Sequence, residues 1–466
     1  MKTTIKSFGI ALLGVGLFAS GCAKKHSAEW KSLKNPEVVA QLKSFVAEKE
    51  AQAHAAVAAG SESAMPEYKP FFAAAEKGDW LALNNAFEDL KKRAPQYEHP
   101  PGTQVDQRLR GNQWVAVMET WGAFDAFVKG DEKYSAAFGN DIIESIPSGS
   151  IYFGGTDPGR FIITAMQKSQ VNGDPFFTLT QNALVDSTYL DYLRSMYGDK
   201  IYIPTAKDSQ KCFLDYTEDA QLRLKENKLK PGENVTQDSG GRIQVRGQVA
   251  VMEINALLAK MIFDKNPDRE FYIEESFPLD WMYPYLEPHG LIFKINRQPL
   301  PELPDEIVKK DHDYWASYIQ PMIGDWLNDD TSVEEVTAFA EKVFAKKDFS
   351  DFKGDPRFIQ NAYSHKMFSK LRSSIGGLYA WRAQQATGAS EKKRMNDEAD
   401  FAFRQALALC PYSPEAVFRY TNLLLSQNRH ADALLVAETA AKMPAMQGRD
   451  GEQVRALVGQ LKRTAK

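Results

Sequence analysis

A glycine-rich segment near the middle of the chain holds the residue types that point most directly to ligand chemistry. It reads GGTDPGR, and the residues that matter are Gly154, Gly155, Thr156, Asp157 and Arg160. Glycines let a backbone approach a ligand, and a following helix N-terminus offers free N–H groups. Ligands bind at the carboxyl ends of strands in open α/β sheets. The segment therefore predicts a ligand-binding loop. Asp157 would accept from sugar hydroxyls or hold a cation, and Arg160 would bind phosphate or carboxylate.

The same segment also has a simpler structural interpretation. It is neither a G-x-G-x-x-G fingerprint nor a P-loop, because the glycine spacing differs and the P-loop lysine is absent. A tight turn in which Asp157 caps the following helix would need the same residues. The sequence leaves both interpretations open.

Acids on later segments are candidates to face the same crevice. Asn182 and Asp186 follow the second predicted strand, and Glu274 and Glu275 follow a later one. Paired carboxylates can carry out acid–base work. Successive strand residues point to opposite faces, so we expect only one of Glu274 and Glu275 to face the crevice. Solvated or salt-bridged acids remain the simpler interpretation.

The usual catalytic patterns are missing from the chain. None of the seven histidines forms H-x-x-x-H or H-E-x-x-H, so a zinc hydrolase is poorly supported. No G-x-S-x-G occurs, and no Ser–His–Asp set can be assembled from sequence alone. We therefore expect no metal and no cofactor, and a binding protein rather than an enzyme.

Composition limits the class of protein further. The 466 residues are 43% hydrophobic and 25% charged, which is ordinary for a folded globular chain. The net charge of −4 gives no basic excess, so we expect no nucleic-acid partner. Three cysteines exclude a disulfide-dense scaffold. Cys212 and Cys410 stand in apolar, helix-like surroundings, and we expect two buried free thiols, although a bridge between them stays open.

The first 22 residues predict an export signal and a lipid anchor. Lys2 and Lys6 precede an uncharged run from Phe8 to Phe18, which is too short to span a bilayer and fits a signal peptide. Small residues then precede Cys22 in a pattern that resembles a bacterial lipobox. We expect cleavage before Cys22 and acylation of that residue, so that the bilayer is one partner. Ala23 is not aspartate, which favours the periplasmic face of the outer membrane over the inner membrane.

Hydrophobic periodicity predicts helices first, then an α/β layer, then helices again. Strands are expected at Ser150–Phe153, Phe176–Leu179, Ile201–Ile203, Phe271–Glu274 and Leu291–Ile295, mostly separated by helices. Such alternation indicates a mainly parallel, Rossmann-like sheet. The segment Asn227 to Gly241 is expected to be a surface loop.

The C-terminal helices show a repeat of about 34 residues. Ala399 to Ala433 and Ala406 to Ala440 are both 34 positions apart, and a proline follows each unit. This spacing resembles the tetratricopeptide repeat, a helix pair in which small residues lie where the two helices touch. Repeats need neighbours to bury both faces, so we expect these helices to pack on the preceding region or on a partner protein.

The expected fold class is thus α/β plus all-α. The expected regions are a lipoprotein signal peptide at 1–21, a tether at 22–35, an N-terminal helical region at 36–146, an α/β domain at 147–298, a helical connector at 299–360, and tetratricopeptide-like helical repeats at 361–466.

Several stretches taken together resemble a known group of proteins. They are IPSGSIYFGGTDPGRFI, VNGDPFFTLTQNALVDSTYLDYLR, FDKNPDREFYIEESFPLDWMYPYLEPHGL and KLRSSIGGLYAWR. They resemble uncharacterised bacterial lipoproteins with tetratricopeptide repeats. The central part is also similar to the soluble extracytoplasmic portion of membrane proteins related to protein O-mannosyltransferases. The catalytic acids of those proteins are expected in a membrane portion that is not found here, so the resemblance implies a binding module and not transferase activity.

Two functions follow as hypotheses. The first is a membrane-tethered, extracytoplasmic binding or assembly lipoprotein that uses its helical repeats to hold a protein partner. The alternative is a sugar- or nucleotide-binding enzyme or accessory subunit of envelope glycan metabolism that acts at the Gly154–Arg160 loop.

Overall fold

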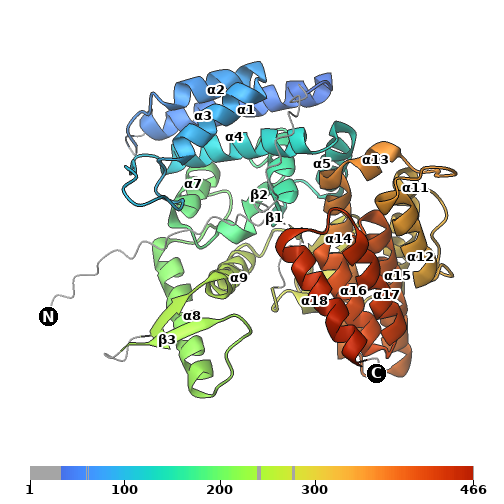
Figure 1. Ribbon diagram of the computed structural model, residues 1–466. Coiled ribbons are helices and arrows are strands. Elements are labelled where there is room, and N and C mark those ends of the chain that lie inside the picture. The colour runs from blue at the N-terminus through green and yellow to red at the C-terminus, as the bar shows by residue number, and fades with distance from the viewer. Residues whose placement is uncertain (1–32, 59, 61, 239–242, 275–278, 465–466) are drawn as a thin grey trace.

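The computed structural model describes residues 33–464, apart from residues 59, 61, 239–242 and 275–278. The expected combination of an α/β layer with helical regions is confirmed at that coarse level. In Figure 1 the N-terminal helices lie across the top, a small sheet lies in the middle, and the C-terminal helices form a bundle at the right.

The sheet is mixed rather than mainly parallel, which corrects the sequence prediction. Its strands are β1 (Ile151–Gly154), β2 (Phe177–Thr180), β5 (Phe271–Ile273), β6 (Leu286–His289) and β7 (Ile292–Ile295). Their order is β2-β1-β5-β7-β6. β1 pairs in parallel with β2 and β5, whereas β7 pairs antiparallel with β5 and β6. Gly290, at φ 60°, allows the tight turn between β6 and β7 that makes this hairpin.

The first helices form a layer that packs on the helical segment after β1 and on α7. Their bounds are α1 Pro36–Ala58, α2 Tyr68–Lys77, α3 Trp80–Lys91, α4 Asn112–Lys129 and α5 Glu132–Ser145. After β1 come a π-helical turn at Pro158–Ile162 and α6 at Ile163–Met166. The Phe161 ring of that turn lies so close to Gly122 of α4 that a Cβ there would overlap it. Helix α4 therefore lies directly against the segment that follows β1.

The middle of the chain departs from the prediction in two places. Ile201–Ile203 is a buried connection and not a strand, because the backbone N–H of Tyr202 donates to the Asn266 side chain instead of to a ladder. The segment expected to be a loop contains β3 (Asn234–Gln237), which pairs with β4 (Ile243–Arg246) in a separate two-stranded sheet.

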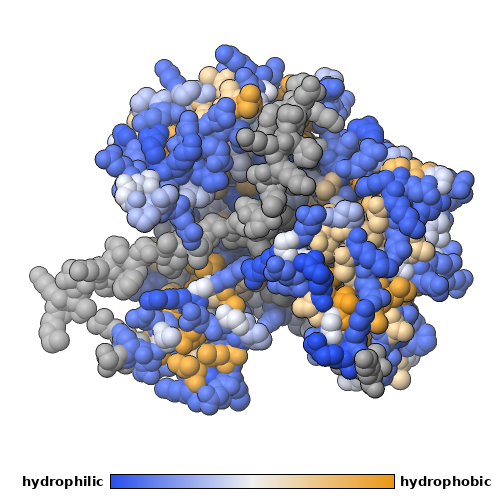
Figure 2. Space-filling view, in the orientation of Figure 1, coloured by the Kyte–Doolittle hydropathy of each residue, from blue (hydrophilic) through white to orange (hydrophobic). Residues whose placement is uncertain are grey.

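Three helices surround these connections. They are α7 (Ser187–Tyr197), α8 (Ala206–Lys225) and α9 (Gln248–Lys265). Figure 1 shows α8 and β3 projecting from the body, and Figure 2 shows apolar surface over this projection. Phe213, Leu214 and Leu222 of α8 are exposed.

The last third of the chain is helical. Its helices are α10 Asp305–Tyr318, α11 Gln320–Ile323, α12 Val333–Ala340, α13 Pro356–Gln360, α14 Ala362–Gln385, α15 Ala389–Leu409, α16 Pro414–Ser426, α17 His430–Lys442 and α18 Gly448–Thr464. Successive helices from α14 to α18 contact one another. Ala399, Ala433 and Ala437 are fully buried, as small residues at helix contacts should be.

Two further expectations concern the cysteines and the membrane. Cys212 and Cys410 are both buried and free, which confirms the expected unpaired thiols. Cys22 lies outside the described residues. Among the residues that are described, no helix is long and apolar enough to span a bilayer.

Candidate functional site

The glycine-rich loop after β1 closes around a carboxylate of the protein itself. Glu274, directly after β5, lies beside the loop because β1 and β5 are parallel neighbours. Its Oε2 accepts from the backbone N–H groups of Gly155 at 3.0 Å and of Thr156 at 2.8 Å. The Thr156 hydroxyl donates to Oε1 of the same carboxylate. The glutamate is only 2% exposed, so an internal anion occupies the N–H groups that were expected to bind a ligand.

The glycines of the loop are explained by this close approach. A Cβ on Gly159 would overlap the Glu274 carboxylate. A Cβ on Gly154 would stand 2.7 Å from the carbonyl oxygen of Gly159. That carbonyl also accepts from the Tyr152 hydroxyl at 3.0 Å, and the Asn182 side chain donates to the Gly155 carbonyl at 2.7 Å. The loop is therefore held from β1, from β5 and from the segment after β2.

The electrostatics of Glu274 reflect its burial. Burial raises the pKa of this carboxyl above its ordinary value, although hydrogen bonds from Thr156 and Gly155 and the Lys370 ammonium act in the opposite direction. Within the described part of the chain, Glu274 makes no ion pair. Burial also raises the pKa of Tyr152 well above its usual range, and the charge of Glu274 adds to this effect. Both groups serve the loop as hydrogen-bonding partners.

The remaining predicted site residues do not converge on the loop. Asp157 is exposed and caps nothing; the hydroxyl of Thr156 instead accepts from the Gly159 N–H at 3.1 Å. Asp186 is the N-cap of α7 and accepts from the Thr188 N–H at 2.9 Å. Glu275 lies outside the described residues. The structure thus joins Gly154, Gly155 and Thr156 with Glu274, and separates Asp157 and Asp186 from them.

Arg160 turns away from this carboxylate. Its guanidinium lies 4.4 Å from the centroid of the Phe161 ring, and Nη2 is 3.7 Å from the sulfur of Met118. Its Nε is buried and has no hydrogen-bond partner in the described structure. Arg160 therefore anchors neither Asp186 nor Glu274, and its charge acts on the next cluster instead.

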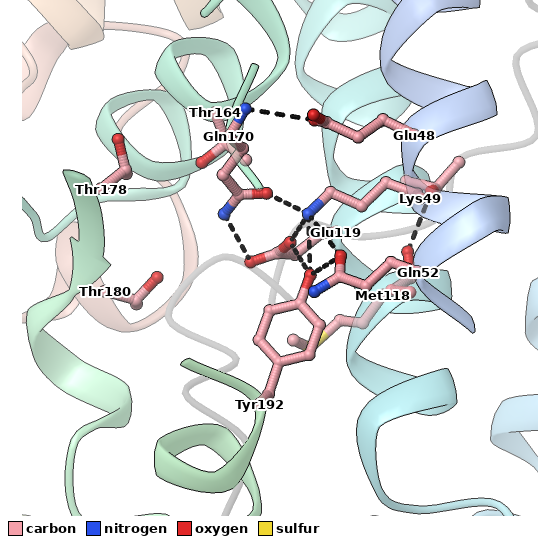
Figure 3. A network of polar contacts seen from close by, with 12 residues as sticks. Glu48, Lys49, Gln52, Met118, Glu119, Thr164, Gln170, Thr178, Thr180 and Tyr192 are labelled. Atoms are coloured by element: carbon pink, nitrogen blue, oxygen red, sulfur yellow. Dashed lines mark hydrogen bonds and ion pairs between the residues drawn. The ribbon is translucent and has the colours of Figure 1, made fainter. Parts of the chain in front are cut away.

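A second polar cluster lies between α1, α4 and α7, and the sequence analysis missed it (Figure 3). Lys49 of α1 is fully buried, and its Nζ lies 2.6 Å from Oε2 of Glu119 on α4. The Tyr192 hydroxyl of α7 is 2.7 Å from both groups. Gln52 and Gln170 complete the coordination of the ammonium.

The charges of this cluster stabilise one another. Burial alone would raise the pKa of Glu119, but the Lys49 ammonium, its hydrogen bond and that of Tyr192 outweigh burial and hold the pKa below its usual value; Arg160 contributes further. A buried pair with satisfied hydrogen bonds holds elements in one arrangement, and breaking it is costly. The signal in the sequence was Glu119, one of two acids in the largely apolar segment WVAVMETWGAFDAFV and the one that is fully buried.

In the described structure no group of three or more His, Cys, Asp or Glu side chains could hold a metal ion. The buried carboxylate of Glu274 and the buried ammonium of Lys49 are saturated by protein groups. Their geometry fits fixing a loop and joining helices.

No protein-family model, no curated protein and no solved structure matches this chain. The function is therefore inferred from the geometry of the chain itself.

Proposed function

We propose that this chain is a membrane-tethered, extracytoplasmic lipoprotein that binds or assembles with a protein partner through its C-terminal helices. Acylated Cys22 would anchor it, at the periplasmic face of the outer membrane, and several acyl chains give stable anchoring. In this proposal α14 to α17 would be two tetratricopeptide-like pairs with α18 after them.

The observation that carries this proposal is a stripe of half-exposed side chains on α14 and α16. The stripe mixes aromatic and charged residues: Tyr363, Lys366, Lys370, Trp381, Glu415, Phe418 and Arg419. Lys370 lies 3.4 Å from Glu415, and the Arg419 guanidinium donates to the Ser373 carbonyl, so the two helices present one continuous surface. Aromatic residues and arginine are the types enriched in protein interfaces.

The alternative, a sugar- or nucleotide-binding enzyme or subunit at the Gly154–Arg160 loop, takes second place. A phosphate at this loop would have to displace the carboxylate of Glu274 from two N–H groups. Arg160, the expected anion ligand, points to Met118 and Phe161. Both facts favour a structural role for the loop.

The test is site-specific photo-crosslinking in intact envelopes. A photoreactive residue at Lys366, on the stripe, is expected to give a discrete protein adduct. The same residue at Lys393, whose side chain is 78% exposed on α15, should give none. A photoreactive residue at Asn422 on α16 is expected to give an adduct with the same partner. Adding Lys366→Glu should remove this second adduct without lowering the thermal midpoint of the protein. Equal labelling from positions 366 and 393 would contradict the proposal.

A further inference from the structure

A surface groove lies between α5 and the corner formed by α10 and α11, away from the stripe and from the glycine-rich loop. It has a volume of about 300 Å³, near the lower end of the range for small ligand sites. Lys133, Tyr134 and Asp141 line it from α5, and Tyr314, Tyr318 and Met322 line it from α10 and α11. The buried Tyr134 and Met322 contribute apolar surface to it.

One end of the groove carries an acid that no base neutralises. Asp141 is half-buried, accepts from the Tyr318 hydroxyl at 2.5 Å, and makes no ion pair among the described residues. The base at the other end is already engaged, because the Lys133 ammonium lies 2.9 Å from Asp355. Lys133 and Asp141 are eight positions apart on α5, or about 12 Å at 1.5 Å per residue. The groove therefore has an uncompensated negative end.

The rings around Asp141 add to its attraction for a cation. Tyr314 and Tyr318 stack with their centroids 5.1 Å apart, beside that carboxylate. Burial raises the pKa of Tyr314, and the charge of the Asp141 carboxylate raises it further. The Tyr314 ring therefore lies close enough to this carboxylate to feel its charge. The faces of aromatic rings attract ammonium groups, and an apolar floor suits a methylene stem.

We propose that this groove binds a lysine side chain of a partner peptide, with the ammonium at Asp141 and the four-carbon stem along Tyr134, Tyr318 and Met322. The groove extends beyond the length of the stem, and the exposed Ser317 and Pro321 at its rim leave room for a peptide backbone. This site is independent of the stripe on α14 and α16, so either assignment can fail without the other.

The test is to titrate the full mature chain with three small probes and to measure binding by calorimetry or from the tyrosine NMR signals. Lysine capped at both ends should bind at least about fivefold more tightly than capped norleucine, which has the stem without the charge. Pentylammonium should bind more weakly than capped lysine. Equal binding of capped lysine and norleucine would overturn the role of Asp141, and equal binding of pentylammonium would overturn the peptide assignment.

Two variants change the groove by different routes. Asp141→Asn keeps a hydrogen-bond acceptor for Tyr318 and should reduce the affinity for capped lysine to that for norleucine. Ala137→Leu fills the groove from α5 and should abolish binding of both probes, so it keeps the test valid if the first variant fails to fold. Asp157→Asn, an exposed acid elsewhere, should leave binding unchanged. Unchanged binding in both groove variants would overturn the proposal.

Discussion

Glu274 determines what the glycine-rich loop is able to bind, because it supplies the anion that the loop geometry demands. Successive backbone N–H groups in a turn form a concavity for negative charge. Here the chain fills that concavity from its own neighbouring strand, with Gly155 and Thr156 donating to one oxygen. The loop therefore acts as a clamp between β1 and β5.

Replacing Glu274 with alanine is expected to lower the free energy of unfolding by about 3 kcal/mol, because it leaves two buried N–H groups and a hydroxyl unsatisfied. Glu274→Gln should lower the free energy of unfolding clearly less, since the amide oxygen can still accept from both N–H groups. Asp157→Ala, at the exposed position of the loop, should change the free energy by less than about 0.5 kcal/mol. Urea denaturation measures the free energy of unfolding of the three variants. Equal losses of stability in Glu274→Ala and Glu274→Gln would contradict the clamp.

His365 is expected to make the helical region sensitive to acid. Burial lowers the pKa of its imidazole from 6.5 to about 3, while the ring bonds the Phe358 carbonyl and Tyr412. Below pH 6.5 the unfolded chain therefore binds a proton that the folded chain does not, so stability is complete above that pH and is lost as the pH falls toward 3. The loss is on the order of 4 kcal/mol at the acid end of that window.

The measurement is urea denaturation of the wild type and of His365→Gln at a series of pH values. The wild type should lose stability more steeply than the variant as the pH falls from neutral. Parallel curves would show that folding does not lower the pKa of His365.

At the scale of elements, the C-terminal helices depend on small residues at their contacts. Ala433 and Ala437 have no exposed surface. Ala433→Leu should destabilise by about 1–3 kcal/mol, the usual effect of overpacking. Gln427→Leu, at the half-exposed C-terminal end of α16, is the matched control and should change little. Equal thermal midpoints for the two variants would contradict the repeat register.

Sequence patterns predicted those elements whose causes are local. Period-3.6 apolar spacing located α1 and α14 to α17, and apolar runs located β1, β2 and β7. The pattern failed for Ile201–Ile203, where buried apolar residues and β-branched types suggest a strand but the hydrogen bonds go to Asn266, a residue distant in sequence. Strand direction is equally non-local, so the mixed sheet could not be derived.

The candidate site also depends on contacts between residues that are distant in sequence. Residue types indicated that backbone N–H groups of the loop would be available to an acceptor. They did not indicate that the acceptor is Glu274 of the chain itself, because that contact joins residues 118 or more positions apart. The pair of Lys49 and Glu119 was missed for the same reason, since each looks like an ordinary helix residue when its partner is unknown.

At the scale of the whole molecule, the Lys49–Glu119 pair joins α1 to α4, and the Tyr192 hydroxyl that bonds both groups ties them to α7 of the α/β layer. Lys49→Met should lower stability by about 3–5 kcal/mol, because it leaves the buried charge of Glu119 unpaired. The double variant Lys49→Met with Glu119→Leu should recover a large part of that loss. Chemical denaturation of both variants checks this, and a double variant no more stable than the single one would contradict a charge-based role.

The first residues that the structure describes are held by α5, which sets an upper limit to the reach of the proposed anchor. The backbone N–H groups of Lys34 and Asn35 donate to the Glu132 carboxylate of α5 at 2.7 and 3.0 Å. From Cys22 to Asn35 the chain spans at most about 45 Å when fully extended. An acylated Cys22 would therefore hold α1 and α5 within that distance of the bilayer.

Cys22→Ser should abolish this attachment, because serine lacks the thiol to which the lipid is joined. The expected result is mature protein in the soluble fraction or an uncleaved precursor, detected by fractionation and by mass spectrometry of the N-terminus. Cys212→Ser is the matched control, since that thiol is buried and free on α8, and it should leave membrane partitioning unchanged. Normal processing and unchanged detergent partitioning of Cys22→Ser would remove the lipid anchor, and with it the tethered arrangement proposed for this chain.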